Sequence, residues 1–98
     1  MRPERLDIEA AKAALAELDG WALEEDGGAI RKSFVFADFS AAFGFMARAA
    51  LAAEKLDHHP EWSNVYNRVE VRLTTHSARG LTALDLDLAR TMDRFAGG

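Results

Sequence analysis

Apolar positions along the chain change from helical spacing to strand alternation and back, twice. Repeats of three and four residues predict helices over residues 8–18, 38–56 and 82–95. Alternation with a period of two predicts β-hairpins over residues 21–36 and 61–75. The predicted order of elements is therefore helix, hairpin, helix, hairpin, helix, or α-β-β-α-β-β-α.

Capping residues mark the starts of the predicted helices. Asp7 precedes the first helix as an N-cap, and either Asp38 or Ser40 can cap the second. Thr82 and Asp85 have the spacing of a capping box at the start of the last helix. These local signals support the helix boundaries given above.

The helical spacing also predicts which side of each helix is buried. The residues expected to be buried are Phe39, Phe43, Met46, Ala50 and Ala53 in the second helix, and Leu84, Leu88, Thr91 and Phe95 in the third. The second hairpin leaves two forms open: a tight turn at Asn67 and Arg68, or one continuous strand bent at a bulge.

Two hairpins can pair into a four-stranded antiparallel sheet with one apolar face, which three amphipathic helices can cover. The sequence therefore predicts an α+β fold, a two-layer sandwich. With 98 residues, we expect a single domain spanning residues 1–98. The other face of the sheet would meet water or another copy of the chain.

Composition narrows the classes of function. Twelve Lys and Arg oppose sixteen Asp and Glu, so the net charge is −4 and no basic stripe is available for direct nucleic-acid binding. The absence of cysteine excludes disulfides, thiolate zinc sites and thiol catalysis. No apolar run approaches the roughly 18 residues of a membrane span, and the charged start lacks a signal core. We expect a soluble, cytoplasmic protein with no membrane partner.

All three histidines of the chain lie between positions 58 and 76. His58 and His59 are expected at the end of the second helix, just before Pro60 stiffens the chain. His76 is expected at the end of a strand. Imidazole exchanges protons near neutral pH, because its unperturbed pKa is about 6.5. These histidines are the first candidates for a catalytic site.

Carboxylates accompany these histidines in the sequence. Glu54 precedes His58 by four residues, so the two share a face while the helix lasts. Asp57 is adjacent to His58, and Asp85 opens the last helix. If the fold places the helix end beside the strand end, two or three imidazoles and two carboxylates meet there.

Structural roles compete with this interpretation. Histidines are often surface residues, Asp85 can act as a helix cap alone, and Trp21 and Trp62 can simply pack in the core or on the sheet. The His and Glu spacing matches no usual zinc signature, so we expect no metal. Neither a nucleophile elbow nor a phosphate-binding loop is present in the sequence.

A longer motif contains the candidate residues. Residues 54–67 read Glu-Lys-Leu-Asp-His-His-Pro-Glu-Trp-Ser-Asn-Val-Tyr-Asn, residues 73–76 read Leu-Thr-Thr-His, and residues 80–85 include Gly80, Thr82 and Asp85. This motif resembles the signature of pterin-4a-carbinolamine dehydratases. The resemblance implies the loss of water from a 4a-hydroxytetrahydropterin to give the quinonoid dihydropterin. It also implies recycling of the tetrahydrobiopterin cofactor for an aromatic amino acid hydroxylase.

The resemblance assigns a role to each candidate. His58 and His76 would be the general acid and base, and His59 would mainly hold the pterin. The supporting residues would be Glu54, Asp57 and Pro60 near the first two histidines, Asp85 behind His76, and Trp21 and Trp62 as walls of the pocket. Because the reaction involves no redox change, no cofactor is expected. Similar proteins assemble through their sheets, so we expect a homodimer or homotetramer.

Two other functions remain open on the sequence. The chain can be a non-catalytic pterin-binding or dimerisation module, because some members of this family act as dimerisation coactivators of a homeodomain transcription factor. It can also serve pterin chemistry near molybdenum cofactor metabolism. The intact histidines favour catalysis over a purely structural role.

Overall fold

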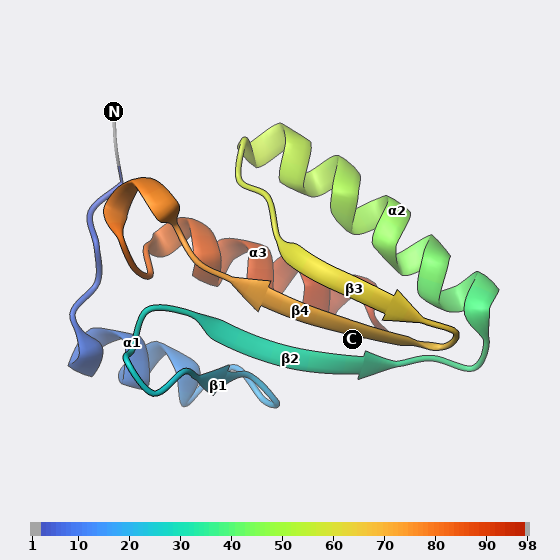
Figure 1. Ribbon diagram of the computed structural model, residues 1–98, viewed down its shortest axis with the longest axis horizontal. Coiled ribbons are helices and arrows are strands. Elements are labelled where there is room, and N and C mark those ends of the chain that lie inside the picture. The colour runs from blue at the N-terminus through green and yellow to red at the C-terminus, as the bar shows by residue number, and fades with distance from the viewer. Residues whose placement is uncertain (1–2, 98) are drawn as a thin grey trace.

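The strands form one four-stranded antiparallel sheet in the order β1-β2-β4-β3. The computed structural model describes residues 3–97 of the chain. The strands are β1 (Ala22–Leu23), β2 (Ile30–Val35), β3 (Glu61–Val65) and β4 (Arg68–Leu73). Two hairpins are therefore present, as predicted, and their longer strands β2 and β4 lie side by side in the middle of the sheet (Figure 1).

The second hairpin turns tightly, and the alternative of one bent strand is wrong. The turn lies at Tyr66 and Asn67, one residue earlier than predicted. Tyr66 adopts a positive φ of 50°, which is rare for residues with a side chain. The Asn64 amide donates hydrogen bonds to the carbonyl oxygens of Tyr66 (3.1 Å) and Arg68 (2.9 Å), and so stabilises this turn.

The helices cover one face of the sheet and leave the other face open (Figure 1). They are α1 (Ile8–Leu15), α2 (Phe39–Leu56) and α3 (Ala83–Phe95), with a short 3-10 turn η1 (His76–Ala78) after β4. This arrangement is the predicted α+β two-layer sandwich. None of the helices within residues 3–97 is long and apolar enough to cross a membrane.

The predicted helix caps are confirmed. Asp7 and Asp38 each accept a hydrogen bond from the backbone N–H three residues further on. Thr82 and Asp85 form the predicted capping box at the start of α3. The first helix is shorter than predicted, because α1 ends at Leu15 and the next residues form turns.

Of the five α2 residues predicted to be buried, only Ala53 is fully buried, so the prediction of the buried face was wrong. Phe39 and Phe43 are exposed, whereas the side chain of Phe45 is fully buried. Phe45 packs against Phe34 and Phe36 of the sheet layer, with ring centroids 4.8 and 5.0 Å away. The other buried residues of α2 are Ala42, Ala49 and Ala53. Since α2 carries apolar residues on nearly every side, its spacing alone did not select one face.

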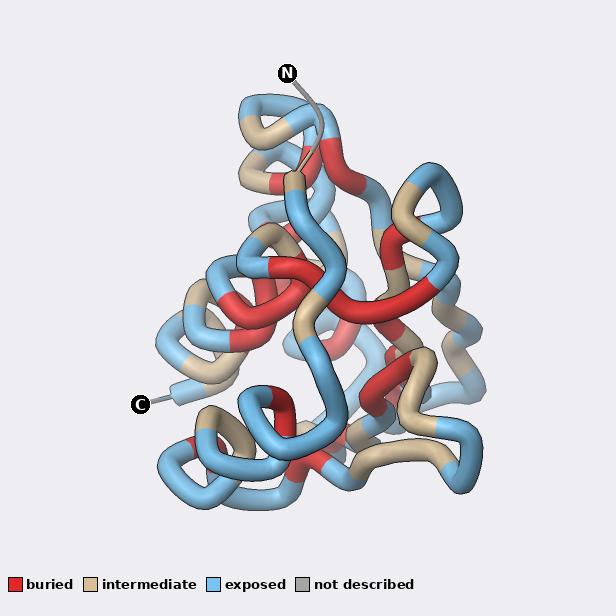
Figure 2. The backbone as a smooth tube through the Cα atoms, turned by 90° about the vertical axis from the view of Figure 1, so that its left-hand side faces the viewer, coloured by how far each residue is buried: buried red, intermediate tan, exposed pale blue. Residues whose placement is uncertain are grey.

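Buried residues gather where the helices meet the sheet (Figure 2). Of the α3 residues predicted to be buried, only Leu88 is fully so; the buried set is Asp85, Leu86, Leu88, Ala89 and Met92. From the sheet, Ile30, Phe34, Val69, Val71 and Leu73 complete the core. The presence of a charged residue, Asp85, in this set leads directly to the candidate site.

We expect Val69→Ala to lower the free energy of unfolding by about 2 kcal/mol, because removing buried methyl groups leaves a cavity. Val35→Ala, on the neighbouring strand β2, should change it by less than about 0.5 kcal/mol, since Val35 is 69% exposed. Urea denaturation followed by circular dichroism measures both. Equal losses at the two positions would mean that the open face of the sheet is buried as well, which would contradict the structure.

Candidate active site

The end of α2 turns His58 into the protein. Asp57 follows the helix in the left-handed conformation (φ 52°, ψ 43°), which Asp adopts more readily than most residues with a side chain. The His58 N–H then donates to the Ala53 carbonyl oxygen at 3.0 Å. As a result the His58 side chain is buried, and its Nε2 lies 2.6 Å from Oδ1 of Asp85.

Asp85 is fully buried, and hydrogen bonds satisfy its carboxylate. Its Oδ2 accepts from the Thr75 hydroxyl (2.8 Å) and from the Thr82 backbone N–H (2.9 Å), while Oδ1 faces His58. An ionised carboxylate only accepts hydrogen bonds. Neutral His58 therefore carries its proton on Nε2, and Nδ1 is left as an acceptor.

Asp85 supports His58 and not His76, so that part of the prediction was wrong. The reason is the capping box: as the third residue of α3, Asp85 bonds back to Thr82 and faces inward, toward the end of α2. Through Thr75 this carboxylate also joins the end of β4 to the same cluster. Three segments distant in sequence thus meet at one buried group.

His59 lies outside this cluster, on the surface. Its Nε2 is 2.6 Å from Oε1 of Glu54, on the last turns of α2. The sequence predicted that Glu54 would share a face with His58. The structure pairs it with His59 instead, because the helix ends at Leu56 and the left-handed Asp57 redirects the chain.

His76 is also exposed, and its partner was missed by sequence analysis. Nε2 of His76 lies 2.9 Å from Oε2 of Glu61, the first residue of β3. Glu61 stands two residues after His59, and His76 follows Thr75, whose hydroxyl bonds to Asp85. Only the register of the hairpin, which no local signal reveals, brings Glu61 to this position.

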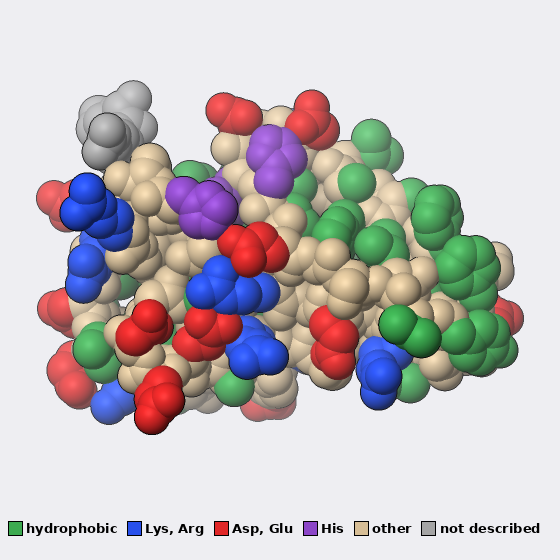
Figure 3. All heavy atoms as spheres, viewed as in Figure 1, with side chains coloured by type: hydrophobic (Ala, Val, Ile, Leu, Met, Phe, Trp, Pro, Cys, Tyr) green, Lys and Arg blue, Asp and Glu red, His purple; other side chains and the backbone are tan. Residues whose placement is uncertain are grey.

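These contacts gather the three histidines at one end of the sheet. Figure 3 shows histidine side chains close together on one face, beside a group of acidic and basic side chains. A hollow of about 530 Å³ lies next to His58; its lining is Pro3, Leu56, Asp57, His58, Thr75, Ser77 and Leu84. His58 is the one histidine that lines this hollow, and His59 and His76 lie outside its lining. An imidazole and a carboxylate beside a hollow can exchange protons with a small molecule.

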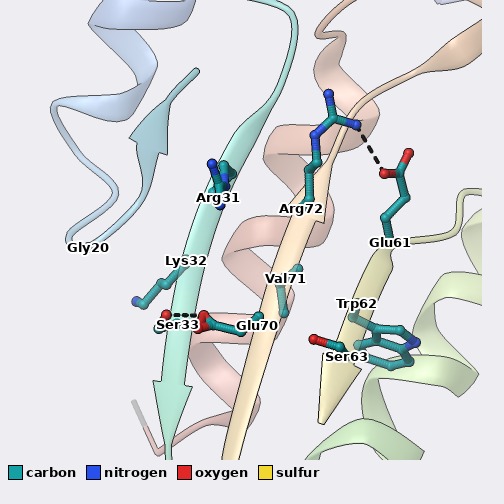
Figure 4. A pocket seen from close by; sticks show the side chains of 10 residues that line it. All are labelled: Gly20, Arg31, Lys32, Ser33, Glu61, Trp62, Ser63, Glu70, Val71 and Arg72. Atoms are coloured by element: carbon teal, nitrogen blue, oxygen red, sulfur yellow. Dashed lines mark hydrogen bonds and ion pairs between the residues drawn. The ribbon is translucent and has the colours of Figure 1, made fainter. Parts of the chain in front are cut away.

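A second, larger hollow lies on the open face of the sheet. It has a volume of about 610 Å³, and Glu61, Trp62 and Arg72 are among the residues that line it (Figure 4). The side chain of Trp62 is half-buried and packs against the core, because Trp62 stands opposite Val71 in the pairing of β3 with β4. Its role as a wall of the pterin pocket stays a prediction. Pro60 connects the two histidines of the helix end to β3.

Trp21 does not belong to the site, contrary to the prediction. It is buried beside Phe34, and its Nε1–H donates to the carboxylate of Asp93. Asp93 lies eight residues after Asp85 on α3, which places it about 12 Å further along the helix. Trp21 therefore packs the core far from the end that carries the histidines.

Comparisons with known proteins agree with the motif. The family model described as "Pterin 4 alpha carbinolamine dehydratase" matches residues 4–95. A protein of Mesorhizobium japonicum, named "Putative pterin-4-alpha-carbinolamine dehydratase", is 58% identical over 98 residues, which is 100% of both chains. The chain belongs to the pterin-4a-carbinolamine dehydratase family. A relative from Novosphingobium aromaticivorans with the same name is 63% identical over 95 residues, covering 97% of this chain and 99% of the relative.

Two solved structures share the fold of this chain. A "transcriptional coactivator/pterin dehydratase" from Brucella melitensis has a TM-score of 0.93 and 57% identity, over 96% of this chain and 100% of that one. A pterin dehydratase-like protein described as a RuBisCO assembly factor in the α-carboxysome has a TM-score of 0.71 and 20% identity, over 81% of this chain and 92% of that one. The second likeness shows the fold alone.

An ion-pair network borders the histidines of this dehydratase-family chain. Arg72 donates to both carboxylate oxygens of Glu24, at 2.8 and 2.9 Å, and to Oε1 of Glu61 at 3.0 Å. Hydrogen bonding to Arg72 lowers the pKa of Glu24, and hydrogen bonding to His76 and then Arg72 lowers the pKa of Glu61. Within residues 3–97, no group of three His, Asp or Glu side chains is arranged to hold a metal ion.

Glu24→Gln should reduce the free energy of unfolding at pH 7 by about 1 kcal/mol, because it breaks the bidentate ion pair between the Glu24 carboxylate and the Arg72 guanidinium. Since the folded-state pKa of Glu24 is lowered, its stabilising effect is present above the unfolded value of 4.5. That effect is lost as the pH falls through the folded-state pKa. Urea denaturation from pH 7 to pH 3 should show the difference from wild type shrinking. The exposed neighbour variant Glu25→Gln is the control, and a pH-independent difference would contradict the prediction.

Proposed function

We propose that the protein catalyses the dehydration of a 4a-hydroxytetrahydropterin to the quinonoid dihydropterin and water. The observation that carries this proposal is a pair of imidazoles at one end of the molecule, each bonded through Nε2 to a carboxylate. His58 is held by Asp85, and His76 by Glu61. In both rings Nδ1 is the nitrogen left for a substrate.

The reaction needs one proton given and one proton taken. The C4a–O bond breaks as the leaving hydroxyl receives a proton and departs as water. The N5–H proton is removed, and its electron pair forms the C4a=N5 double bond. The reaction is not a redox reaction and needs no electron carrier. Positioned imidazoles exchange protons near neutral pH, and such general acid–base catalysis contributes typically about 10²–10⁴-fold.

The geometry supports different roles for the three histidines. His58 and His76 are assigned to proton transfer, because they flank the junction of α2, β4 and α3. His59, exposed beside Glu54, is assigned to holding the pterin. Asp57 lines the hollow next to His58, where a carboxylate can accept hydrogen bonds from the amide and amino groups of the ring.

The family supplies the wider setting of this proposal. A 4a-hydroxytetrahydropterin is the product of aromatic amino acid hydroxylases, so we place the protein with such an enzyme, in the cytoplasm, in tetrahydrobiopterin recycling. Residues 1–98 would act as one domain, which agrees with the family match over residues 4–95. The dehydratase names of relatives at 57–63% identity support the activity.

A coactivator or binding role is the second candidate. It rests on the Brucella structure, whose name combines a transcriptional coactivator with a pterin dehydratase. A protein that only binds a partner has no need of two imidazoles that each face a carboxylate. The arrangement of His58 and His76 therefore favours the enzyme.

We expect His58→Gln and His76→Gln each to slow dehydration at least about 100-fold, since neither amide can transfer a proton at neutral pH. Gln at position 58 can still donate a hydrogen bond to Asp85. Ala would leave the buried Oδ1 of Asp85 without its hydrogen bond and could destabilise the fold. His59→Ala should mainly raise KM. Stopped-flow absorbance of a freshly generated carbinolamine measures all three variants.

Circular dichroism of each variant is the control for folding in that experiment. If the folded double variant His58→Gln/His76→Gln dehydrates the carbinolamine at the wild-type rate, the acid–base assignment is wrong. If the wild-type protein does not raise the rate of dehydration above the uncatalysed rate, only the binding role remains.

We also propose that the protein is a homodimer or homotetramer, in which α2 gives a contact between copies in addition to the contact through the sheets that the resemblance implies. Phe39, Phe43 and Leu51 of α2 are 49%, 58% and 74% exposed and form an apolar surface on the helix side away from the core. A second copy of this chain would remove that surface from water, at about 25 cal/mol for each Å² of apolar area.

The double variant Phe43→Glu/Leu51→Glu should lower the mass of the assembly, because two charges per chain then face the apolar surface of the other copy. Light scattering after gel filtration gives the mass. Ala13→Glu, at an exposed position of α1, is the matched control and should keep the wild-type mass. An unchanged mass in the double variant would rule out α2 as an interface.

A further inference from the structure

The backbone of His76 is held in place by the surrounding structure, but its side chain is exposed. Its main chain begins η1, just after the antiparallel bridge between Thr75 and Gly80. Its side chain is 81% exposed, so packing does not select one ring orientation. An unrestrained surface histidine samples several rotamers and both neutral tautomers. A proton-transfer role for His76 therefore requires another group to orient the ring.

Glu61 is placed to do this. Its two carboxylate oxygens have separate partners: Oε2 faces His76 Nε2 at 2.9 Å, and Oε1 accepts from Nη1 of Arg72 at 3.0 Å. Glu61 and Arg72 stand directly opposite each other in the pairing of β3 with β4. Figure 4 shows the two side chains reaching toward each other across these strands. The orientation of the carboxylate is thus set by the sheet.

Arg72 is itself held from the other side. Its Nε and Nη2 donate to the two oxygens of Glu24, which follows β1 in the chain. The planar guanidinium has a rigid fork of donors, so engaging it on two edges fixes its plane. A continuous series of contacts, Glu24 to Arg72 to Glu61 to His76, therefore runs across the open face of the sheet.

The charge state of Glu61 decides which nitrogen of His76 holds the proton. Hydrogen bonds from His76 and Arg72 lower the pKa of Glu61, so it stays ionised where an imidazole titrates. A carboxylate accepts only, so neutral His76 must carry its proton on Nε2. Nδ1 is then the basic nitrogen, as it is in His58.

We propose that Glu61, held by Arg72, is a positioning residue that fixes the ring orientation and the Nε2–H tautomer of His76. This inference rests on the proposed function, because it concerns a histidine assigned to proton transfer. It adds a residue outside the His58, His59 and His76 set, and it extends the site to the β1–β2 hairpin through Glu24. The alternative is that Glu61 and Arg72 form an ion pair that only stabilises the sheet.

The test compares Glu61→Ala with Glu61→Gln and with the control Glu70→Ala. Glu61→Gln keeps the length of the native side chain but has only one acceptor oxygen; with that oxygen on Arg72, which can only donate, its amide N–H2 faces Nε2 of His76. Glu70 lies on the same open face, two residues before Arg72 on β4. Its carboxylate accepts a hydrogen bond from the Ser33 hydroxyl. Two readouts are taken: the ¹⁵N shifts of His76 at pH 9, which report the neutral tautomer, and kcat and KM from stopped-flow dehydration.

In Glu61→Ala we expect a mixture of His76 tautomers, a fall in kcat of roughly tenfold or more, and KM within about twofold of wild type. Glu61→Gln should shift neutral His76 toward the Nδ1–H tautomer, because the amide donates to Nε2, and should also lower kcat. Glu70→Ala should leave both readouts unchanged. An ion pair that only stabilises the sheet would lower the unfolding midpoint of Glu61→Ala without moving kcat.

The outcomes separate this inference from the proposed function. If His76→Gln lowers kcat but Glu61→Ala keeps the wild-type tautomer and kcat, the positioning role is wrong and the dehydratase assignment stands. If His76→Gln keeps the wild-type kcat, the role of His76 is wrong and the positioning role falls with it.

Discussion

The buried carboxylate of Asp85 is the group on which both the fold and the candidate site depend. A carboxylate without access to water is costly unless hydrogen bonds satisfy it. Here the Thr82 N–H, the Thr75 hydroxyl and His58 Nε2 do so. The first of these bonds starts α3, the second ties α3 to the end of β4, and the third ties both to the end of α2. Folding these elements together therefore also places His58 beside the hollow.

The two imidazoles assigned to proton transfer are held in different ways. His58 is fixed by burial and by a carboxylate that cannot move without disrupting the helix cap. His76 is fixed at the surface by Glu61, whose own position comes from Arg72. Electrostatic interactions are stronger at the buried pair, because water screens the exposed pair. The site thus combines one rigid imidazole with one that a substrate can reach freely from solvent.

Local signals in the sequence were sufficient for much of this structure. Asp38 and the Thr82–Asp85 pair mark helix starts through contacts within three residues, so the element order and the caps were predictable. The buried side of α2 was not, because Phe43 and Phe45 are equally apolar and only the position of the sheet distinguishes them. The histidines were found as candidates by residue type. Asp85 was found too but was assigned to His76, and Glu61 was missed, because the pairs His58–Asp85 and His76–Glu61 span 27 and 15 residues.

The register of the second hairpin links this long-range pairing to a local turn. Residues on a strand alternate between the two faces, so a slip of one residue would move Glu61 from the open face to the helix-covered face. The slip is opposed by the tight turn, where Tyr66 adopts a positive φ and the Asn64 amide bonds to two backbone carbonyl oxygens. With the turn in place, Glu61 stands opposite Arg72 and within reach of His76. A turn at the far end of the hairpin therefore determines which carboxylate the exposed histidine meets.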